Sequence, residues 1–288
     1  MTDRELAARL ETLGRRDPSL APMLGLYEAA LREAGDRAWD AAVEPGPPAA
    51  GPPALARARL ALDPAVLHEW TARLAAAAGG LADGAVVAAA ARIDPAALVL
   101  AATRLDDAAI ERLARTAAVL PETLAAFAHL AALPLLAAAG RRLGPAPAGW
   151  TRGACPICGA WPVLAELRGI ENERHPRCGR CGGDWTAAWL ACPFCETTDH
   201  EHLGSLVVEP AGDRKGAMDR RKVDVCRSCR GFLKALPTLT PLDPRAVVVE
   251  DLANVELDVA ALVRGFERPP KPAWAPLSVR ADETGTRT

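Results

Sequence analysis

The chain has 288 residues, of which 34 are Lys or Arg and 36 are Asp or Glu, so its formal net charge is −2 at pH 7. This balance argues against a protein that binds nucleic acid through a general basic excess. No apolar run reaches the ~18 to 20 residues that cross a bilayer, so we expect no membrane insertion. The first residues, MTDRELAARLE, lack the basic start and apolar segment of a signal peptide, which predicts a cytoplasmic protein.

An all-α helical domain is predicted for residues 1–144. Of the 62 alanines in the chain, 46 lie in the first 150 residues. Asp63-Pro64 and Asp94-Pro95 each place a capping acid before a proline at the first helical position, so each pair predicts a helix start. A further helix is expected to begin at Pro121 and to kink or break at Pro134.

The second half of the chain is predicted to contain metal-binding ribbons over residues 150–240. Strands are expected at 161–167, 184–190, 203–209, 222–225 and 231–236. Asp243-Pro244 predicts a last helix, 243–265, that packs on the preceding domains. Prolines after residue 269 predict a flexible tail over 269–288. Together these elements indicate an α+β fold, with a helical bundle followed by two rubredoxin-like or zinc-ribbon modules and a C-terminal helix.

All eight cysteines lie in this second half and form four CxxC pairs. The pairs are Cys155/Cys158, Cys178/Cys181, Cys192/Cys195 and Cys226/Cys229. A CxxC loop can direct both sulfurs toward one ion, and two such loops complete a tetrahedral Cys₄ shell. Four loops therefore predict two metal ions, either iron or zinc. Disulfides are the less favoured alternative, because a cytoplasmic protein lies in a reducing compartment.

Two pairing orders are possible. Pairing the first loop with the second gives CxxC-x19-CxxC, which matches the usual spacing of about 15 to 20 residues, and this sequential order is favoured. The alternative is an interleaved order, in which the first loop pairs with the fourth and the second with the third. It is possible because only 10 residues separate the two middle pairs. Gly159 and Gly182 follow the second cysteine of their loops and permit a tight turn, whereas Glu196 and Arg230 predict looser loops at the second site.

No catalytic residues are predicted. The sequence lacks a nucleophile elbow, an HExxH motif, a phosphate-cradling loop and a dinucleotide-binding glycine pattern. A fully Cys-ligated ion also has no open position for substrate. Stapling of small hairpins by metal is the simplest role for such sites. His175, His200 and His202 flank the loops, but four complete pairs leave no vacancy for them among the ligands.

The ordered cysteine pairs and their flanks resemble the FdhE family of formate dehydrogenase accessory proteins. The resemblance is carried by Cys155-Pro156-Ile157-Cys158-Gly159 with Trp161-Pro162-Val163, by Arg177-Cys178 through Asp184-Trp185, by Cys192-Pro193-Phe194-Cys195, by Val225-Cys226 through Lys234, and by Glu250-Asp251-Leu252-Ala253. It covers residues 150–270 well and the helical half only in general character. It implies a non-catalytic cytoplasmic chaperone that acts on the catalytic subunit of formate dehydrogenase and has rubredoxin-like Cys₄ sites that can hold iron.

A zinc-ribbon module that binds nucleic acid is the competing hypothesis. Residues 150–236 carry a formal charge of +2, which becomes about −2 once eight thiolates and two divalent ions are counted, and this disfavours phosphate binding. One basic cluster, in the hairpin before the last cysteine pair, is a candidate contact for an acidic client surface: Arg214, Lys215, Arg220, Arg221 and Lys222. Glu250 and Asp251 could instead meet a basic partner. The sequence gives no indication of the oligomeric state.

Overall fold

A computed structural model describes residues 1–47, 51, 53–78, 92–207, 221–269, 271–272 and 274–283. The chain forms two compact units. The first contains Met1–Gly144 and the segment that begins at Trp274, and the second contains Pro145–Ala273. The predicted α+β fold class, with a helical N-terminal half, is confirmed.

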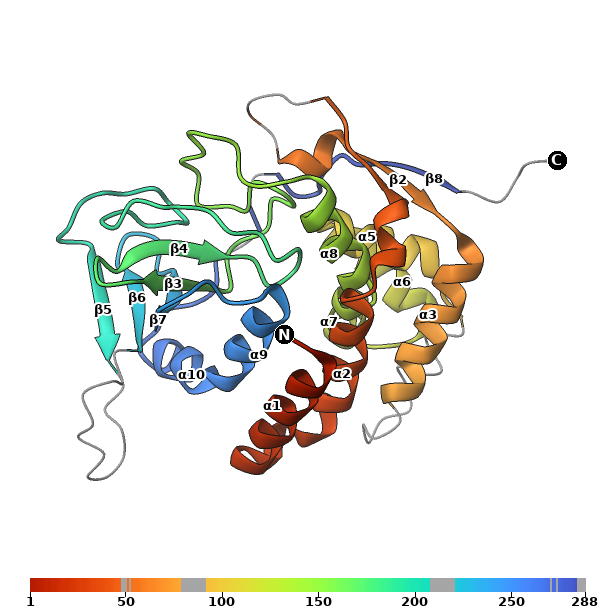
Figure 1. The fold of residues 1–288 in the computed structure, drawn as a ribbon, viewed down its shortest axis with the longest axis horizontal. Helices are drawn as coiled ribbons and strands as arrows, with labels where there is room; N and C mark the ends of the chain where they lie inside the picture. The colour runs from red at the N-terminus through yellow and green to blue at the C-terminus, as the bar shows by residue number, and fades with distance from the viewer. Residues whose placement is uncertain are drawn as a thin grey trace. The chain divides into compact units, whose positions relative to one another are not determined.

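Helices dominate the first unit (Figure 1). They are α1 (Asp3–Arg16), α2 (Ala21–Ala34), α3 (Pro64–Ala77), α5 (Pro95–Arg104), α6 (Asp107–Ala117), α7 (Pro121–Ala131) and α8 (Leu133–Arg142), with short 3₁₀ turns at Pro18–Leu20, Arg37–Ala42 and Ala54–Arg57. Asp63 and Asp94 accept hydrogen bonds from the first-turn amides of α3 and α5, as predicted. The chain bends by 42° between α7 and α8, next to Pro134.

The first unit also contains a small sheet that the sequence did not predict. Its strands are β1 (Val43–Glu44), β2 (Arg59–Leu62) and β8 (Arg280–Glu283), with β2 in the middle. Strand β8 runs parallel to β2, Arg59 pairs with Asp282, and the buried side chains of Leu277 and Val279 lead into the strand. The prediction that residues 269–288 form a flexible tail is therefore wrong for 280–283, because these residues pair with Arg59–Leu62, far earlier in the chain.

The second unit is built on one five-stranded sheet. Its strands are β3 (Leu164–Arg168), β4 (Glu173–Arg177), β5 (Leu203–Val207), β6 (Lys222–Cys226) and β7 (Phe232–Thr238). Their order is β4-β3-β7-β6-β5; β3 and β7 are parallel, and the other neighbours are antiparallel. Sequence analysis missed β4 and placed a strand at 184–190, where only Asp184 forms a bridge, to Arg177. The ribbons are thus parts of one sheet.

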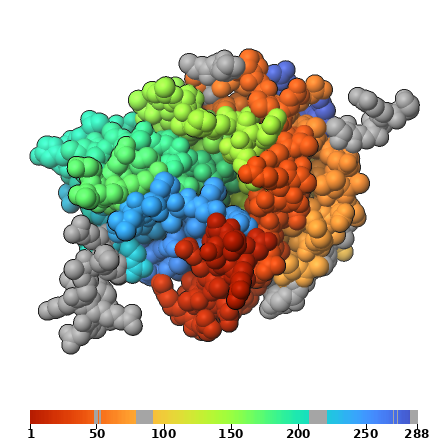
Figure 2. Space-filling model, in the orientation of Figure 1, coloured from red at the N-terminus to blue at the C-terminus, as the bar shows by residue number. Residues whose placement is uncertain are grey.

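The predicted last helix is two helices. α9 (Pro244–Ala253) and α10 (Val255–Val263) are separated at Asn254, and both pack against the sheet through Val247, Leu257 and Ala261. The two helices are not buried all round, since the side chains of Val259 and Leu262 on α10 lie at the surface. Figure 2 shows the two helices as a blue area on the visible face of the molecule.

No single helix among the described residues is long and apolar enough to cross a membrane. Helices α7 and α8 reach the required length only when taken together across their bend.

Candidate metal centres

The eight cysteine sulfurs form two clusters in the second unit. One contains Cys155, Cys158, Cys178 and Cys181, and the other contains Cys192, Cys195, Cys226 and Cys229. Within each cluster the sulfurs lie within 4.8 Å of one another. The first loop therefore meets the second and the third meets the fourth, which is the sequential order; the interleaved order is not formed.

The same local geometry builds all four loops. In each loop the amide of the first cysteine donates to the carbonyl of the fifth residue after it, as in Cys155 N to Ala160 O at 2.8 Å and Cys226 N to Gly231 O at 2.9 Å. In three of them the residue after the second cysteine donates back to the first, as in Gly159 N to Cys155 O at 2.9 Å. These bonds turn both sulfurs of a loop to one side.

The residue after each second cysteine has a left-handed backbone in all four loops. Gly159 and Gly182 have φ of 74°, and Glu196 and Arg230 have φ of 60° and 61°. The looser loops expected at the second site are not formed, even though a non-glycine residue loses about 1 kcal/mol or more in this conformation. Arg230 offsets this cost, because its guanidinium donates to Gly265 O at 2.6 Å and lies 4.5 Å from the ring centroid of Phe266.

The sulfur spacing matches a tetrahedral metal shell. Sulfurs from different loops are 3.4 and 3.5 Å apart in the first cluster and 3.7 Å apart in the second. A tetrahedron with metal–sulfur bonds of about 2.3 Å has edges of about 3.8 Å. Amides also point at the sulfurs, since Phe194 N donates to Cys192 Sγ and Gly231 N donates to Cys229 Sγ, each at 3.4 Å. The residues fit a tetrahedral ion at each cluster.

The protonation chemistry of the clusters also favours a cation. Burial raises the pKa of the Cys155 thiol and of the Cys192 thiol. Hydrogen bonds from neighbouring thiols lower the pKa of Cys178, and those from its own loop lower the pKa of Cys226 despite its burial. Desolvation and neighbouring sulfurs raise the pKa of Cys229 to about 11. Several thiolates cannot be held together in such surroundings without a positive charge, and a bound metal ion deprotonates its cysteine ligands outright.

The two clusters differ in accessibility. All four cysteines of the first cluster are buried. In the second cluster Cys195 is exposed and Cys229 is half-buried. An ion in the first cluster would be enclosed by protein, whereas an ion in the second would be reachable from solvent on the side of Cys195.

Arg174 connects the second cluster to the strand that leads into the first. Its side chain is only 4 % exposed, and its guanidinium donates to Ala191 O at 2.9 Å, directly before Cys192. It also pairs with Asp224 at 3.2 Å, two residues before Cys226. A single arginine on β4 thus holds both halves of the second cluster, and β4 itself ends next to Cys178.

A buried ionic network supports the first cluster. Glu166 is 0 % exposed and accepts from Arg177, from Arg168 Nε at 2.8 Å and from the amide of Leu242 at 3.2 Å. Burial alone would raise the pKa of the Glu166 carboxyl, but the hydrogen bond from Arg168 and the charge of Arg177 outweigh it and hold this pKa below its ordinary value. Arg177 directly precedes Cys178, so the network fixes the start of the second loop.

The proposed partner-binding residues are only partly described. Arg214, Lys215 and Arg220 lie outside the described residues. Arg221 donates to Asn254 Oδ1 at 2.8 Å and pairs with Glu256, so it is tied to the start of α10. Lys222 pairs with Asp224 at 3.0 Å. Arg221 and Lys222 therefore have partners within the chain, which reduces their value for docking an acidic surface.

The acidic pair of α9 also has partners within the chain. Asp251 lies 2.5 Å from the buried ammonium of Lys234, and the carboxylate of Glu250 accepts from Asn254 Nδ2 at 3.5 Å. Among the flanking histidines, His175 bonds Asp184 at 3.0 Å, and within the described residues no histidine joins either cysteine cluster.

Sequence reasoning missed Glu166, Arg174 and Lys234 as structural residues. Glu166 and Lys234 are charged residues between apolar neighbours inside a strand, and that pattern was the available signal; Arg174, between Glu173 and His175, carried no such signal. The pattern has little weight alone, because such residues on a half-exposed strand usually face solvent.

The chain was compared with known proteins and structures. No family model and no curated protein sequence matches it. Its structure is similar to the crystal structure of the FdhE protein from Pseudomonas aeruginosa, with a TM-score of 0.58 and 23 % sequence identity over 95 % of this chain and 94 % of that one. The chain has the FdhE fold. The resemblance inferred from the cysteine motifs is thus confirmed at the level of the fold.

Proposed function

We propose that the protein is a non-catalytic accessory factor that helps to mature formate dehydrogenase. The observation that carries this proposal is the FdhE fold, which covers 95 % of a chain that also contains two Cys₄ clusters. The flanking motifs of the cysteine pairs, which resemble the same family, are independent support. The proposed client is the catalytic subunit of formate dehydrogenase, met in the cytoplasm before assembly is complete.

Two metal ions are part of this proposal. The ligands would be the four cysteines of each cluster, and the ion would be iron, as in rubredoxin, or zinc. Either ion would join two distant loops into one folded unit, because binding free energy in such sites is also folding free energy. A complete shell of four sulfurs leaves no position for substrate, which supports a scaffold and not an enzyme.

The client-binding surface is proposed to include the basic residues Arg214, Lys215 and Arg220. Arg221 and Lys222 contribute less, because each already pairs with an acidic residue of the same chain, Glu256 and Asp224 respectively. A triple alanine variant of the first three residues should bind the client more weakly at low salt, since steering depends on the local field. The Arg221→Ala variant is the matched control from the same segment.

Co-purification tests the function. The tagged chain and the formate dehydrogenase catalytic subunit of the same organism should elute together, and deleting the gene for this chain should lower formate dehydrogenase activity without lowering the amount of that subunit. A chain that neither co-purifies with the subunit nor changes its activity would refute the accessory role. Binding to DNA or RNA that falls steeply with salt would support the zinc-ribbon alternative instead.

Metal analysis tests the second part of the proposal. Protein purified without air should contain two ions per chain, and after oxidation ferric Cys₄ gives visible colour whereas zinc gives none. A metal content near zero in a folded protein would overturn the ligand assignment.

A further inference from the structure

A pocket of about 150 Å³ lies against the second cysteine cluster, entirely within the second unit. Strands β5 and β6, residues 189–194 and Arg174 form its walls. Cys192 and Cys226 are among the lining residues. An engineered apolar cavity of about this size in another protein holds benzene, so the pocket has room for a ligand with a six-membered ring.

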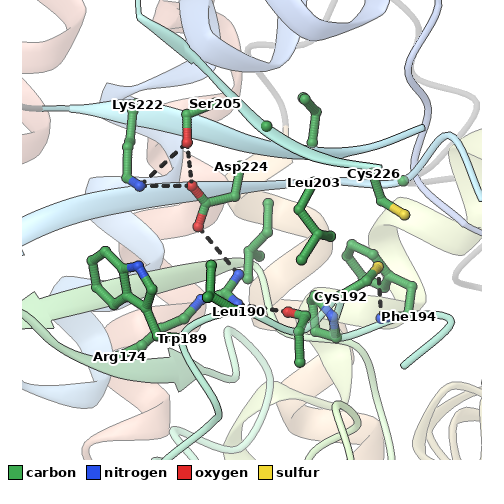
Figure 3. Close-up of a pocket in the computed structure, with 16 residues that line it drawn as sticks. Arg174, Trp189, Leu190, Cys192, Phe194, Leu203, Ser205, Lys222, Asp224 and Cys226 are labelled. Atoms are coloured by element: carbon green, nitrogen blue, oxygen red, sulfur yellow. Dashed lines mark hydrogen bonds and ion pairs between the residues drawn. The ribbon is translucent and has the colours of Figure 1, made fainter. Parts of the chain in front are cut away.

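The pocket has a polar end and an apolar end. Figure 3 shows Lys222, Ser205 and Asp224 together at one end and Cys192 with Phe194 at the other. The side chains of Leu190 and Leu203 lie between the two ends (Figure 3). A ligand that matches this arrangement has an apolar body and one polar group.

The charges at the polar end favour an anionic group. Lys222 Nζ lies 3.0 Å from Asp224 Oδ1, and Arg174 lies 3.2 Å from Asp224 Oδ2, so two cations share one carboxylate. Ser205 Oγ also donates to Asp224, at 3.0 Å, which satisfies that carboxylate further. The polar end therefore retains a net positive charge of one.

Arg174 contributes charge to this end and not a free donor. It lines the pocket with its side chain only 4 % exposed, and its guanidinium already donates to Ala191 O and pairs with Asp224. Trp189 adds a flat apolar surface next to Lys222, whose Nζ lies 5.1 Å from the centroid of the Trp189 ring.

We propose that this pocket binds a small organic carboxylate, with its carboxylate toward Lys222 and Arg174 and its apolar body toward Phe194 and the cysteine cluster. This orientation also keeps the negative group away from the thiolates of Cys192 and Cys226. The ligand would lie against the more accessible of the two clusters and shield it from solvent. The proposal does not depend on the accessory function, because it concerns a pocket within one unit of the chain.

Three probes of similar or smaller size test it on the full chain loaded with zinc. Benzoate carries both proposed features, benzylamine has the same body with a positive charge, and acetate has the charge without the body. Binding would be followed by NMR through the indole N–H signal of Trp189, assigned with a Trp189→Phe variant. Benzoate should shift this signal in a saturable way, whereas benzylamine and acetate should not.

Two variants locate the site. Lys222→Met should weaken benzoate binding about tenfold, which corresponds to the loss of one charged contact of about 1.4 kcal/mol. Arg221→Met is the matched control, because Arg221 is the neighbouring residue, pairs with Glu256 and does not line the pocket. It should leave benzoate binding unchanged. Melting temperature and zinc content would be measured for both variants, and Ser205→Ala serves as the second pocket variant if Lys222→Met is not folded.

Four results would overturn the proposal. The first is the absence of a saturable benzoate shift up to about 10 mM, which would mean a binding free energy weaker than about 3 kcal/mol. The second and third are benzylamine or acetate binding as tightly as benzoate. The fourth is an unchanged benzoate affinity in the folded pocket variant.

Discussion

Lys234 Nζ lies 2.6 Å from Asp258 Oδ2, which joins the central part of the sheet to helix α10. The same ammonium donates to Asp251 O at 2.7 Å, at the end of α9, and its side chain is only 1 % exposed. One lysine on β7 therefore holds both helices where the chain breaks between them. The lysine satisfies one carbonyl in the last turn of α9 and ties α10 to the sheet through Asp258.

Replacing Lys234 by methionine should destabilise the second unit by about 2 kcal/mol. Removal of one partner from a buried ion pair usually costs about 3 to 5 kcal/mol, but Asp251 and Asp258 are partly exposed and can be hydrated, so we expect less. Urea unfolding at pH 7 measures the change. The exposed Arg264→Met variant is the control, and equal midpoints for the two variants would contradict this role of Lys234.

Stability of the second unit should decline as the pH falls below about 4.5, the ordinary range of a glutamate pKa. The pKa of Glu166 is lowered in the folded state, so its contribution is complete above the unfolded pKa and is lost as the pH falls through the folded value. The Glu166→Gln variant should lose stability at pH 7 and show a weaker decline in acid. Unfolding curves at several pH values, with metal content measured at each, provide the test. Exposed Glu171→Gln should behave like the wild type.

Chelation should remove the two ions in separate phases, the second site first. Cys195 is exposed and Cys229 is half-buried, whereas the first cluster is enclosed. A coloured chelator under anaerobic conditions would follow the release. Cys195→Ser should abolish the fast phase and leave the slow phase intact. A single phase with a stoichiometry of two would show that exposure does not control release.

Arg174→Met should weaken metal binding at the second cluster about tenfold and leave the first unchanged, because residues that orient ligands usually contribute that much. The variant removes the bonds to Ala191 O and Asp224 that position both loops. Competition with a chelator of known affinity measures it, and Arg227→Met, which loses only a bond to Glu201 O, is the control. If the two variants bind metal equally tightly at the second cluster, Arg174 does not position the ligands of that cluster.

A fragment of residues 145–273 should be soluble and bind two ions. The fragment 145–288 should aggregate more readily, because β8 lacks its partner β2 and the apolar residues Leu277 and Val279 are uncovered. Size-exclusion chromatography with metal analysis compares the two. Aggregation of the shorter fragment with both ions bound would show that the second unit cannot fold alone.

The sequence by itself determined the features that depend on short stretches of chain. Asp63-Pro64 and Asp94-Pro95 start helices because a capping carboxylate and a fixed proline φ act within one turn. The grouping of the cysteines followed from loop spacing, since each CxxC loop closes through its own backbone bonds. The family resemblance rested on the same local motifs and predicted the fold.

Only the tertiary structure decided what depends on distant partners. Strand β8 forms because β2 offers it a parallel edge, and the prolines before it gave no sign of that pairing. Arg174, Glu166 and Lys234 are buried because matching charges reach them from other elements, whereas sequence alone makes charged strand residues solvent-facing. Asn254 divides the last helix where α10 turns to cover the sheet. These features depend on contacts between residues far apart in the chain, and local propensity carries no information about such contacts.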